Sequence, residues 1–524
     1  PGLRATPAAL PGPPCAPPMN ATDPAPTDTR AAAGEPAAAA AVAAAPPPAR
    51  LRALHELPGP PALPLVGHLL QLQAPRVHQQ LERWCARFGP LYTLRLGQRP
   101  VLVCADAEAT AAALADRPEG FRRSSRLADV AAGLGLPAGV FIAEGEAWRR
   151  QRRVVMAAFD SNHVRRYHPA LVGVAQQLGE RWAAAARAGR AVELQAELMR
   201  YAVDAIAGLA FGSPVNSLQA GGSAIQQHLD RVFPALFSRL LSPLPHWRWL
   251  RTPAVRGIEA SMAALNEAVR GFVAAAHQRL DADAERRAHP QNLLEAMIVA
   301  ADQPGSGVDD AQIAGNVFTL LLAGEDTTAH TLAWLLDLLW RHPAALQRAS
   351  AEVQAVCGRA EAPTLEQLAA LPYVEACLHE TLRLKPVAPL LATEALRDGR
   401  VGGVRVPRGT LVVHLMRRET GLPQGPRFEP ARWLADGGFG ATAGPEAAAL
   451  RRLNTPFGAG PRQCPGRHLA MLQMKLAVAV LLGRFEITGL ATPHGGPPAE
   501  CLAYTMSPEA LQMWLRERPW PAQP

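Results

Sequence analysis

The chain has 524 residues, 48% of them hydrophobic, and carries a formal net charge of +8 at neutral pH. This apolar fraction supports a large buried core, and the length fits one large domain or two smaller ones. The positive charge comes from arginines spread along the chain without an aromatic-basic module, which argues against nucleic acid and leaves a membrane surface or an acidic protein as partners.

The first fifty residues differ in composition from the rest. Residues 1–50 are rich in alanine and proline with few large apolar side chains, which predicts a disordered tail before a single domain over 51–524. The apolar stretch 37–45 is too short and too alanine-rich for a transmembrane helix, and it lacks the charged start of a signal peptide. The seven cysteines show no metal-site or disulfide spacing, which is typical of reduced thiols. We therefore expect a cytoplasmic protein.

Hydrophobic periodicity predicts a mainly α fold with small β-sheets. A proline-rich segment at 57–61 marks the start of the fold, and two strands at 91–96 and 100–104 meet through Gly97. Further strand-like pieces lie near 391–414 and 501–516. Apolar residues at three-four spacing predict helices over 78–88, 146–158, 168–188, 193–211, 225–241, 255–282, 291–301, 308–341, 343–357, 365–371, 374–384 and 467–483.

The predicted helix over 308–341 would be about 50 Å long at 1.5 Å per residue. Its centre, Ala323-Gly324-Glu325-Asp326-Thr327-Thr328, places two carboxylates, two hydroxyls and a glycine between apolar flanks. Glycine weakens a helix by about 1 kcal/mol, and a buried carboxylate without partners costs several kcal/mol more. A solvated helix face would explain these residues only if the flanks were polar, so we favour a functional site.

Two other charged motifs lie at helical spacing. Trp148 and Arg152 share a face at i and i+4, and Glu380 and Arg383 share one at i and i+3, with Arg432 in a later proline-rich segment. Taken alone, each pattern is equally typical of an exposed charged helix.

Cys464 lies in the loop Phe457-Gly458-Ala459-Gly460-Pro461-Arg462-Gln463-Cys464-Pro465-Gly466. Its three glycines favour sharp turns and a close approach to a large flat group. The following helix places Cys464 at a helix N-terminus, where the dipole and free amides favour a thiolate. A thiolate in such a loop suits an axial haem ligand.

The residues Phe457, Gly460, Arg462, Cys464 and Gly466 fill every position of Phe-x-x-Gly-x-Arg-x-Cys-x-Gly. This pattern resembles the haem-binding loop of the cytochrome P-450 superfamily. The other three motifs follow the family order, and the resemblance runs from about residue 57 to about residue 515. It implies the cytochrome P-450 fold, with haem b between the long central helix and the helix after the cysteine loop, in a soluble bacterial-type member without a fused reductase.

The resemblance also implies roles for site residues. Asp326 and Thr327 would be the acid-alcohol pair of oxygen activation, beside a dioxygen groove at Ala323 and Gly324, while Glu325 would take a supporting or surface position. The haem propionates would bind Trp148, Arg152 and Arg462. A structural network behind the haem would join Glu380, Arg383 and Arg432, although Ala431 stands where the family usually has an acidic residue.

The expected activity is that of a haem-thiolate monooxygenase. It would use dioxygen and two externally supplied electrons to hydroxylate or epoxidise a lipophilic molecule, such as a fatty acid, terpenoid or polyketide-like compound. No flavin or nicotinamide fingerprint follows the haem loop, so NAD(P)H would act through a ferredoxin and its reductase or through a flavoprotein. The candidate basic patch for that donor consists of Arg149, Arg153, Arg467 and Lys475.

Three alternatives stay open: a peroxide-driven hydroxylase, an isomerase of the same fold, and a non-catalytic haem sensor. The intact Asp326–Thr327 pair favours the monooxygenase over all three. We expect a monomer, and the tryptophan-bearing stretch 233–249 leaves a peripheral membrane contact open.

Overall fold

The computed structural model describes residues 50–212, 217–220, 224–242, 245–359, 361–417, 425–434 and 445–519. The predicted alanine- and proline-rich tail lies outside these ranges except for Arg50. The unit that starts at Arg50 is a mainly helical domain with small sheets, as predicted. In the described ranges, no helix combines the length and the apolar character needed to cross a bilayer.

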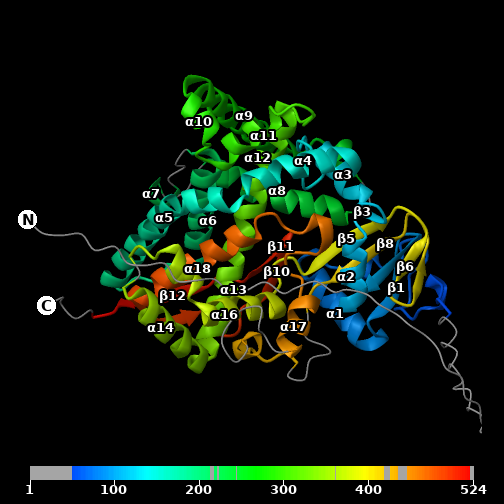
Figure 1. The fold of residues 1–524 in the computed structure, drawn as a ribbon. Coiled ribbons are helices and arrows are strands. Elements are labelled where there is room, and N and C mark those ends of the chain that lie inside the picture. The colour runs from blue at the N-terminus through cyan, green and yellow to red at the C-terminus, as the bar shows by residue number, and fades with distance from the viewer. Residues whose placement is uncertain are drawn as a thin grey trace, which may run out of the picture. The chain divides into compact units, whose positions relative to one another are not determined.

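Helices account for most of this unit, and Figure 1 shows them surrounding a central region that contains α13 and α18. The helices in its first part are α1 Val77–Phe88, α2 Ala107–Ala115, α3 Ser125–Gly133, α4 Gly145–Ala158, α5 Ser161–Arg187, α6 Leu194–Phe211, α7 Ser217–Ala220, α8 Ala224–Leu241, α9 Pro253–Ala282, α10 Ala284–Ala288 and α11 Leu293–Ala301. Those that follow are α12 Asp310–Gly324, α13 Asp326–Arg341, α14 Pro343–Cys357, α15 Leu365–Ala369, α16 Pro372–Leu384, α17 Pro445–Leu453 and α18 Arg467–Arg484.

Several helix boundaries differ from the predicted ones because of capping side chains. α12 begins at Asp310 rather than 308 because the Asp309 carboxylate accepts from the Gln312 amide, and the Gln312 side chain bonds back to Asp309. α5 begins seven residues before the predicted start because Asp160 caps it. α16 begins at Pro372, a residue that suits a first helical turn.

The strands come from both ends of the domain. They are β1 Leu91–Leu96, β2 Arg99–Cys104, β3 Phe121–Arg123, β4 Val192–Glu193, β5 Leu390–Ala395, β6 Gly399–Val401, β7 Val404–Val406, β8 Leu411–Leu415, β9 Phe485–Ala491, β10 Glu500–Ala503, β11 Thr505–Pro508 and β12 Gln512–Glu517.

The largest sheet has the order β1-β2-β8-β5-β3, and Figure 1 shows its early strands in blue beside the later ones in yellow. β1 and β2 form the predicted hairpin, with Leu94 opposite Val101 and Gly97 at a φ of 63°. β2 pairs in parallel with β8, so the sheet joins the N-terminal strands to the predicted strand region near 391–414. The remaining strands form the two hairpins β6–β7 and β10–β11 and a three-stranded sheet, β4-β12-β9.

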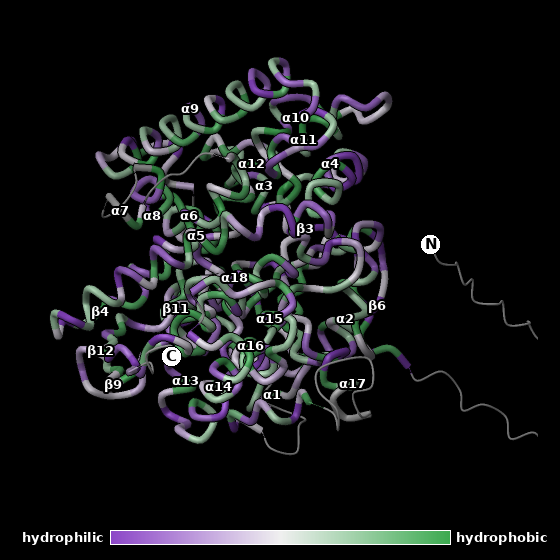
Figure 2. The backbone as a smooth tube through the Cα atoms, turned by 60° about the vertical axis from the view of Figure 1, so that its left-hand side comes forward, coloured by the Kyte–Doolittle hydropathy of each residue, from purple (hydrophilic) through white to green (hydrophobic). Residues whose placement is uncertain are grey.

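The main hydrophobic core surrounds α18, the helix that follows the Cys464 loop. Every residue from Gln473 to Gly483 is buried, and α5, α13, α14 and α16 pack against this helix. The Tyr201 hydroxyl of α6 donates to the Gln473 carbonyl at 2.9 Å and ties α6 to the same helix. By contrast, α9 alternates hydrophobic and hydrophilic turns along its length (Figure 2), as expected of a helix with one solvated face.

The prediction of one continuous helix over 308–341 is wrong. The helix is interrupted at Glu325, between α12 and α13, where φ is −76° and ψ is −77°. The Thr327 hydroxyl donates to the Ala323 carbonyl at 2.7 Å, and Thr331 bonds in the same way to Thr327. Such back-bonding competes with the backbone ladder and bends helices. Gly324 adds backbone freedom at the same turn.

Candidate active site

The loop that carries Cys464 depends on two glycines. Gly458 and Gly460 have φ values of 73° and 68°, in the left-handed region. A Cβ on Gly460 would lie 2.7 Å from the Cα of Ala115 and 2.8 Å from the Leu114 carbonyl oxygen of α2, so this position requires glycine. The Cys464 amide donates to the Phe457 carbonyl at 2.9 Å and closes the loop.

The third glycine of this loop does not behave as predicted. Gly466 has a φ of −84°, which any residue adopts, and serves as the N-cap of α18. A Cβ there would approach the Phe159 ring no closer than 3.7 Å, an ordinary contact. The predicted sharp turn at Gly466 is therefore wrong.

The Cys464 thiol lies near the positive charges of Arg152 and Arg467, but it is shielded from water. Burial raises its pKa, while the Gly466 backbone and the charges of Arg152 and Arg467 oppose this effect. The predicted thiolate is therefore not produced by the helix end alone. A metal cation on the sulfur would supply the missing positive charge, since a coordinating thiol is deprotonated outright.

Three predicted residues meet beside this loop. Arg462 donates to the Ala143 carbonyl at 2.8 Å and to Glu144 at 2.5 Å, and its guanidinium carbon lies 4.5 Å from the centre of the buried Trp148 ring. Arg152 donates to the Gln463 carbonyl, next to the cysteine, at 2.7 Å. The structure thus gathers these side chains on one side of the cysteine loop.

Two further arginines, Arg117 and Arg123, belong to the same cluster and were missed in the sequence. Arg117 is buried, and the charges of Arg123 and Arg462 act with burial to lower its pKa to about 9. Burial, with the charges of Arg123 and Arg152, lowers the pKa of Arg462 to about 10, against the opposing effect of Glu144. No spacing pattern distinguishes Arg117 and Arg123 from the other arginines of this basic chain.

The arginine cluster (Arg117, Arg123 and Arg462) has too few acceptors among the described residues. Nε and Nη2 of Arg117, Nε of Arg123, and Nε and Nη1 of Arg462 are buried without hydrogen-bond partners there. Glu144 is the carboxylate that faces this cluster; it also accepts from the Arg123 amide at 3.0 Å. A buried guanidinium without an anion is costly, so the cluster suits a ligand bearing carboxylates. The two propionates of haem fit this requirement beside a cysteine sulfur.

A second polar group lies at the break between α12 and α13. The Thr505 hydroxyl of β11 is 3.2 Å from Asp326 Oδ2, to which it donates, and 3.2 Å from His330 Nδ1. Burial raises the pKa of Asp326 to about 6, against the effect of the Thr505 hydrogen bond, and lowers the pKa of His330 to about 4. The histidine is therefore neutral, and its Nδ1–H can donate to the same hydroxyl.

Glu325, expected in a supporting or surface position, lies in the interior instead. Its side chain is 1% exposed, and neither carboxyl oxygen has a hydrogen-bond partner among the described residues. Burial, with added repulsion from Asp326 and Asp230, raises its pKa well above the usual value. The surface assignment is therefore wrong, and the environment of Glu325 favours its protonated form.

The predicted oxygen-groove residues differ in accessibility. Ala323 is exposed and Thr327 is half-buried, one turn apart on the same side of the interrupted helix. At Gly324, a Cβ would lie 2.9 Å from Cγ1 of Ile206, so this glycine allows α6 to pack closely. Accessible space is therefore found at Ala323 and Thr327, and a groove role for Gly324 stays a prediction.

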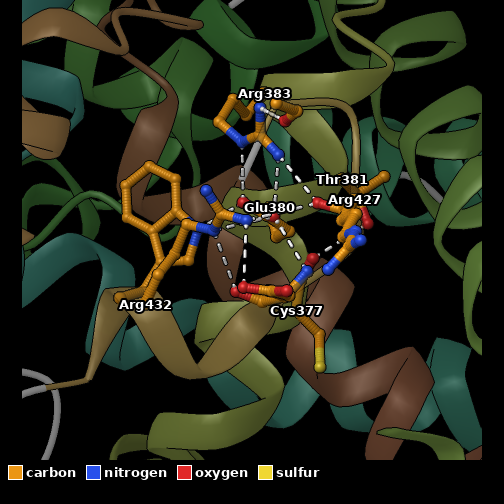
Figure 3. Close-up of polar contacts among 9 residues, drawn as sticks. Cys377, Glu380, Thr381, Arg383, Arg427 and Arg432 are labelled. Atoms are coloured by element: carbon orange, nitrogen blue, oxygen red, sulfur yellow. Dashed lines mark hydrogen bonds and ion pairs between the residues drawn. The ribbon is translucent and has the colours of Figure 1, made fainter. Parts of the chain in front are cut away.

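The predicted structural network forms around one fully buried carboxylate (Figure 3). Glu380 accepts from Arg383 Nε and Nη2 at 2.9 and 2.8 Å and lies 3.2 Å from Arg432 Nε. The Trp433 indole and the Glu429 amide also donate to it, at 2.8 and 3.0 Å. Both Arg383 and Glu380 are fully buried, which makes this a complete charge-assisted network.

Ala431, which stands where the family usually has an acidic residue, cannot pair with Arg432. Glu429, two residues before Ala431, lies 3.4 Å from Arg432 Nη2 and contacts this guanidinium instead.

The predicted donor patch is largely absent. Lys475 is buried and pairs with Glu375 at 2.8 Å, while Arg149 pairs with Glu119 and with Glu146. Arg467 bonds Gln463 and His468. Of the four residues, only Arg153 is exposed without an ion-pair partner in the described part of the chain, so the four-residue patch is not supported.

Comparisons with known proteins agree with this geometry. The family model described as Cytochrome P450 matches residues 57–500. The pentalenene oxygenase of Streptomyces avermitilis is 28% identical over 467 residues, covering 88% of this chain and 97% of its own length. The cyclooctat-9-en-7-ol 5-monooxygenase of Streptomyces melanosporofaciens is 28% identical, covering 82% of this chain and 88% of its own.

Plant and structural relatives agree. Cytochrome P450 734A6 of Oryza sativa subsp. japonica is 31% identical over 439 residues, covering 79% of this chain and 77% of its own. The crystal structure of the cytochrome P450DA heme domain superposes with a TM-score of 0.74 at 26% identity, covering 89% of this chain and 99% of that one.

Replacing Glu380 tests the buried network. Glu380→Gln keeps the side-chain shape but leaves two guanidinium groups without their countercharge, so the free energy of unfolding should fall by about 3–5 kcal/mol. Urea denaturation of the variant and the parent protein measures this loss. Glu146→Gln, which removes an exposed ion pair, should change it by less than about 1 kcal/mol. Equal stability of Glu380→Gln and the parent would contradict the network.

Replacing Asp326 tests the buried acid. Its raised pKa means that ionisation destabilises the fold as pH rises from about 4 to about 6, by a total of about 3 kcal/mol. Asp326→Asn should therefore be more stable than the parent by about 3 kcal/mol at pH 7.5 but only about 1 kcal/mol at pH 4.5. Denaturation curves at both pH values measure this, with the exposed Asp129→Asn as control. A difference that does not vary with pH would show that ionisation is not the cause.

Proposed function

The chain belongs to the cytochrome P450 superfamily of monooxygenases, and from this we propose that it binds haem b through Cys464 and oxygenates a lipophilic small molecule. The observation that carries the proposal is the pairing of a cysteine sulfur with an arginine cluster that has one carboxylate, Glu144, for three guanidinium groups. Burying three guanidinium groups beside one carboxylate is costly, and a ligand that carries two carboxylates would offset this cost.

The residues of the Cys464 loop and of the arginine cluster each have a role in holding the haem. Cys464 would supply the sulfur ligand of the iron, and Gly458 and Gly460 give the loop the shape that presents this sulfur. Arg117, Arg123 and Arg462 would bind the propionates, with Trp148 and Arg152 beside them. Haem held in this way would supply the oxidising chemistry, which a thiolate ligand favours.

The residues at the interruption between α12 and α13 hold and transfer protons. Asp326, with a pKa of about 6, can both hold and release a proton near neutral pH, which suits a general acid. Thr505 and His330 keep its carboxyl oriented, and the buried Glu325 side chain, whose pKa burial and the neighbouring Asp326 raise, is the adjacent acid in the chain. Thr327 presents its hydroxyl oxygen on the accessible side, with its proton directed to Ala323. Asp326 and Thr327 thus act as the catalytic pair.

We propose a terpenoid-sized substrate among the lipophilic classes. The two Streptomyces relatives are named for oxygenating pentalenene and cyclooctat-9-en-7-ol. In this chain, Tyr504 lies between Phe141 and Phe233, with ring centres 6.4 and 5.9 Å away. These rings come from three separate segments and form an aromatic cluster, with the Arg123 guanidinium 3.7 Å from the centre of the Phe141 ring, and we propose that this cluster contacts the substrate.

Electrons would come from NAD(P)H through a separate ferredoxin or flavoprotein, as the family generally requires. The acid at Asp326 and the alcohol at Thr327 favour this monooxygenase over a peroxide-driven hydroxylase, an isomerase or a haem sensor. The bacterial type, cytoplasmic location and monomeric state stay predictions.

A carbon monoxide difference spectrum tests haem ligation. The reduced protein should give the strongly red-shifted Soret band of a thiolate ligand, and Cys464→Ala should abolish it, because its methyl group cannot bind iron. Cys501→Ala, which removes an exposed thiol, should leave the band unchanged. A haem-loaded parent protein with an unshifted band would refute the assignment.

The proposed role of Thr327 in proton delivery is tested by measuring how much product forms for each NADPH consumed. With a surrogate ferredoxin system and a turned-over terpenoid, Thr327→Ala should lower product formed per NADPH by roughly tenfold and raise hydrogen peroxide. Thr331→Ala is a matched control, since it removes the same type of back-bond one turn later. Equal coupling in both variants would indicate a purely structural effect on the helix.

A further inference from the structure

Four arginines lie close together on α4, at positions 149, 150, 152 and 153, and they differ in whether their side chains have hydrogen-bond or ion-pair partners. Arg149 pairs with Glu119 and Glu146, and Arg152 bonds the Gln463 carbonyl. Arg150 and Arg153 have no recorded ion pair or side-chain acceptor among the described residues. The two therefore present unused guanidinium charge away from the haem site.

These two arginines line an open surface cavity of about 310 Å³ between α4 and the end of α11 with the segment that follows it. The remaining lining residues are mostly small or apolar: Val154, Ala300, Gln303, Pro304, Gly305 and Ser306. A volume of this size exceeds what a single oxyanion needs and leaves room for an attached organic group.

The segment that follows α11 has a backbone shape that holds the Arg150 side chain in this cavity. Its Nε is buried without a hydrogen-bond partner. Gly307 has a φ of 61°, and a Cβ there would lie 2.9 Å from Arg150 Nη1 and 3.1 Å from its Cδ. The glycine therefore makes room for the guanidinium to lie across the loop.

Neighbouring groups do not neutralise the two arginines. Asp302, next to Gln303, already pairs with Arg287. The Ser306 hydroxyl donates to the Ala301 carbonyl and accepts from the Val308 amide at 3.3 Å. The charged donors available to a ligand are therefore those of the guanidinium groups, beside the Gln303 amide, which donates to the Val299 carbonyl at 3.2 Å.

We propose that this cavity, lined by Arg150 and Arg153, is a binding site for an oxyanion, either a phosphate or a carboxylate group. Two guanidinium groups on one helix face match the planar, bidentate geometry that such anions prefer. The apolar wall of Val154, Ala300 and Pro304 suits a ligand in which the anion is attached to a small organic group. The site is independent of haem binding, because Trp148 and Arg152 occupy another face of α4.

Isothermal titration of the haem-loaded protein with sodium phosphate tests the site, with sodium acetate as the carboxylate arm and sodium chloride at equal ionic strength as the background. We expect saturable 1:1 binding of phosphate or acetate, and the tighter of the two identifies the anion class. Arg150→Gln and Arg153→Gln should each weaken it about tenfold, the effect of losing one charge-assisted contact.

Two matched variants separate a built site from general surface charge. Arg149→Gln removes the same charge from the same helix but should leave the affinity unchanged. Gly307→Ala keeps both arginines but displaces Arg150, and should weaken binding as Arg150→Gln does. No saturable binding, or equal weakening by Arg149→Gln and Arg153→Gln, would overturn the proposal. Haem content and the carbon monoxide spectrum report independently on the proposed oxygenase.

Discussion

The architecture of the site depends on keeping like charges together in an interior that has little water. On the loop side, Arg117, Arg123 and Arg462 lie around Glu144, and burial lowers the pKa of all three, with added repulsion between the arginines at Arg117 and Arg462. At the helix break, burial raises the pKa of both Glu325 and Asp326, and no cation pairs with either among the described residues. Each group costs folding free energy that the surrounding helices must supply, a cost typical of functional sites.

The network around Glu380 illustrates the contrast between a structural and a functional use of charge. Its carboxylate receives donors from Arg383, Arg432, Trp433 and the Glu429 amide, so every buried charge has its partner. Nothing remains there for a ligand to satisfy. In the arginine cluster, by contrast, several N–H groups have no acceptor, and that deficit marks it as a binding site.

Local sequence pattern was enough for most elements, for the Cys464 loop and for the residues that meet at Glu380, but not for Gly466 or Glu325. Periodic apolar positions predicted the helices, and the spacing around Cys464 predicted its loop. What could not be predicted depended on contacts between distant segments. Lys475 is buried because Glu375, one hundred positions earlier, lies beside it, and Arg117 joins Arg462 only when α2 meets the loop. The break at Glu325 arises from side-chain bonds to the backbone, which compete with helix propensity in a way that apolar periodicity does not register.

The β10–β11 turn connects the aromatic cluster around Tyr504 to the acid Asp326, two parts of the site that have different roles. Tyr504, held at a φ of 89°, faces the aromatic rings of Phe141 and Phe233, and the next residue, Thr505, bonds Asp326. Adjacent residues on one rigid turn cannot move independently. A substitution that reshapes Tyr504 to admit a bulkier compound therefore also displaces the hydroxyl that orients the acid. In directed evolution, widening the range of compounds accepted at this turn would trade against efficient use of reducing equivalents, unless a second change restored the position of Thr505.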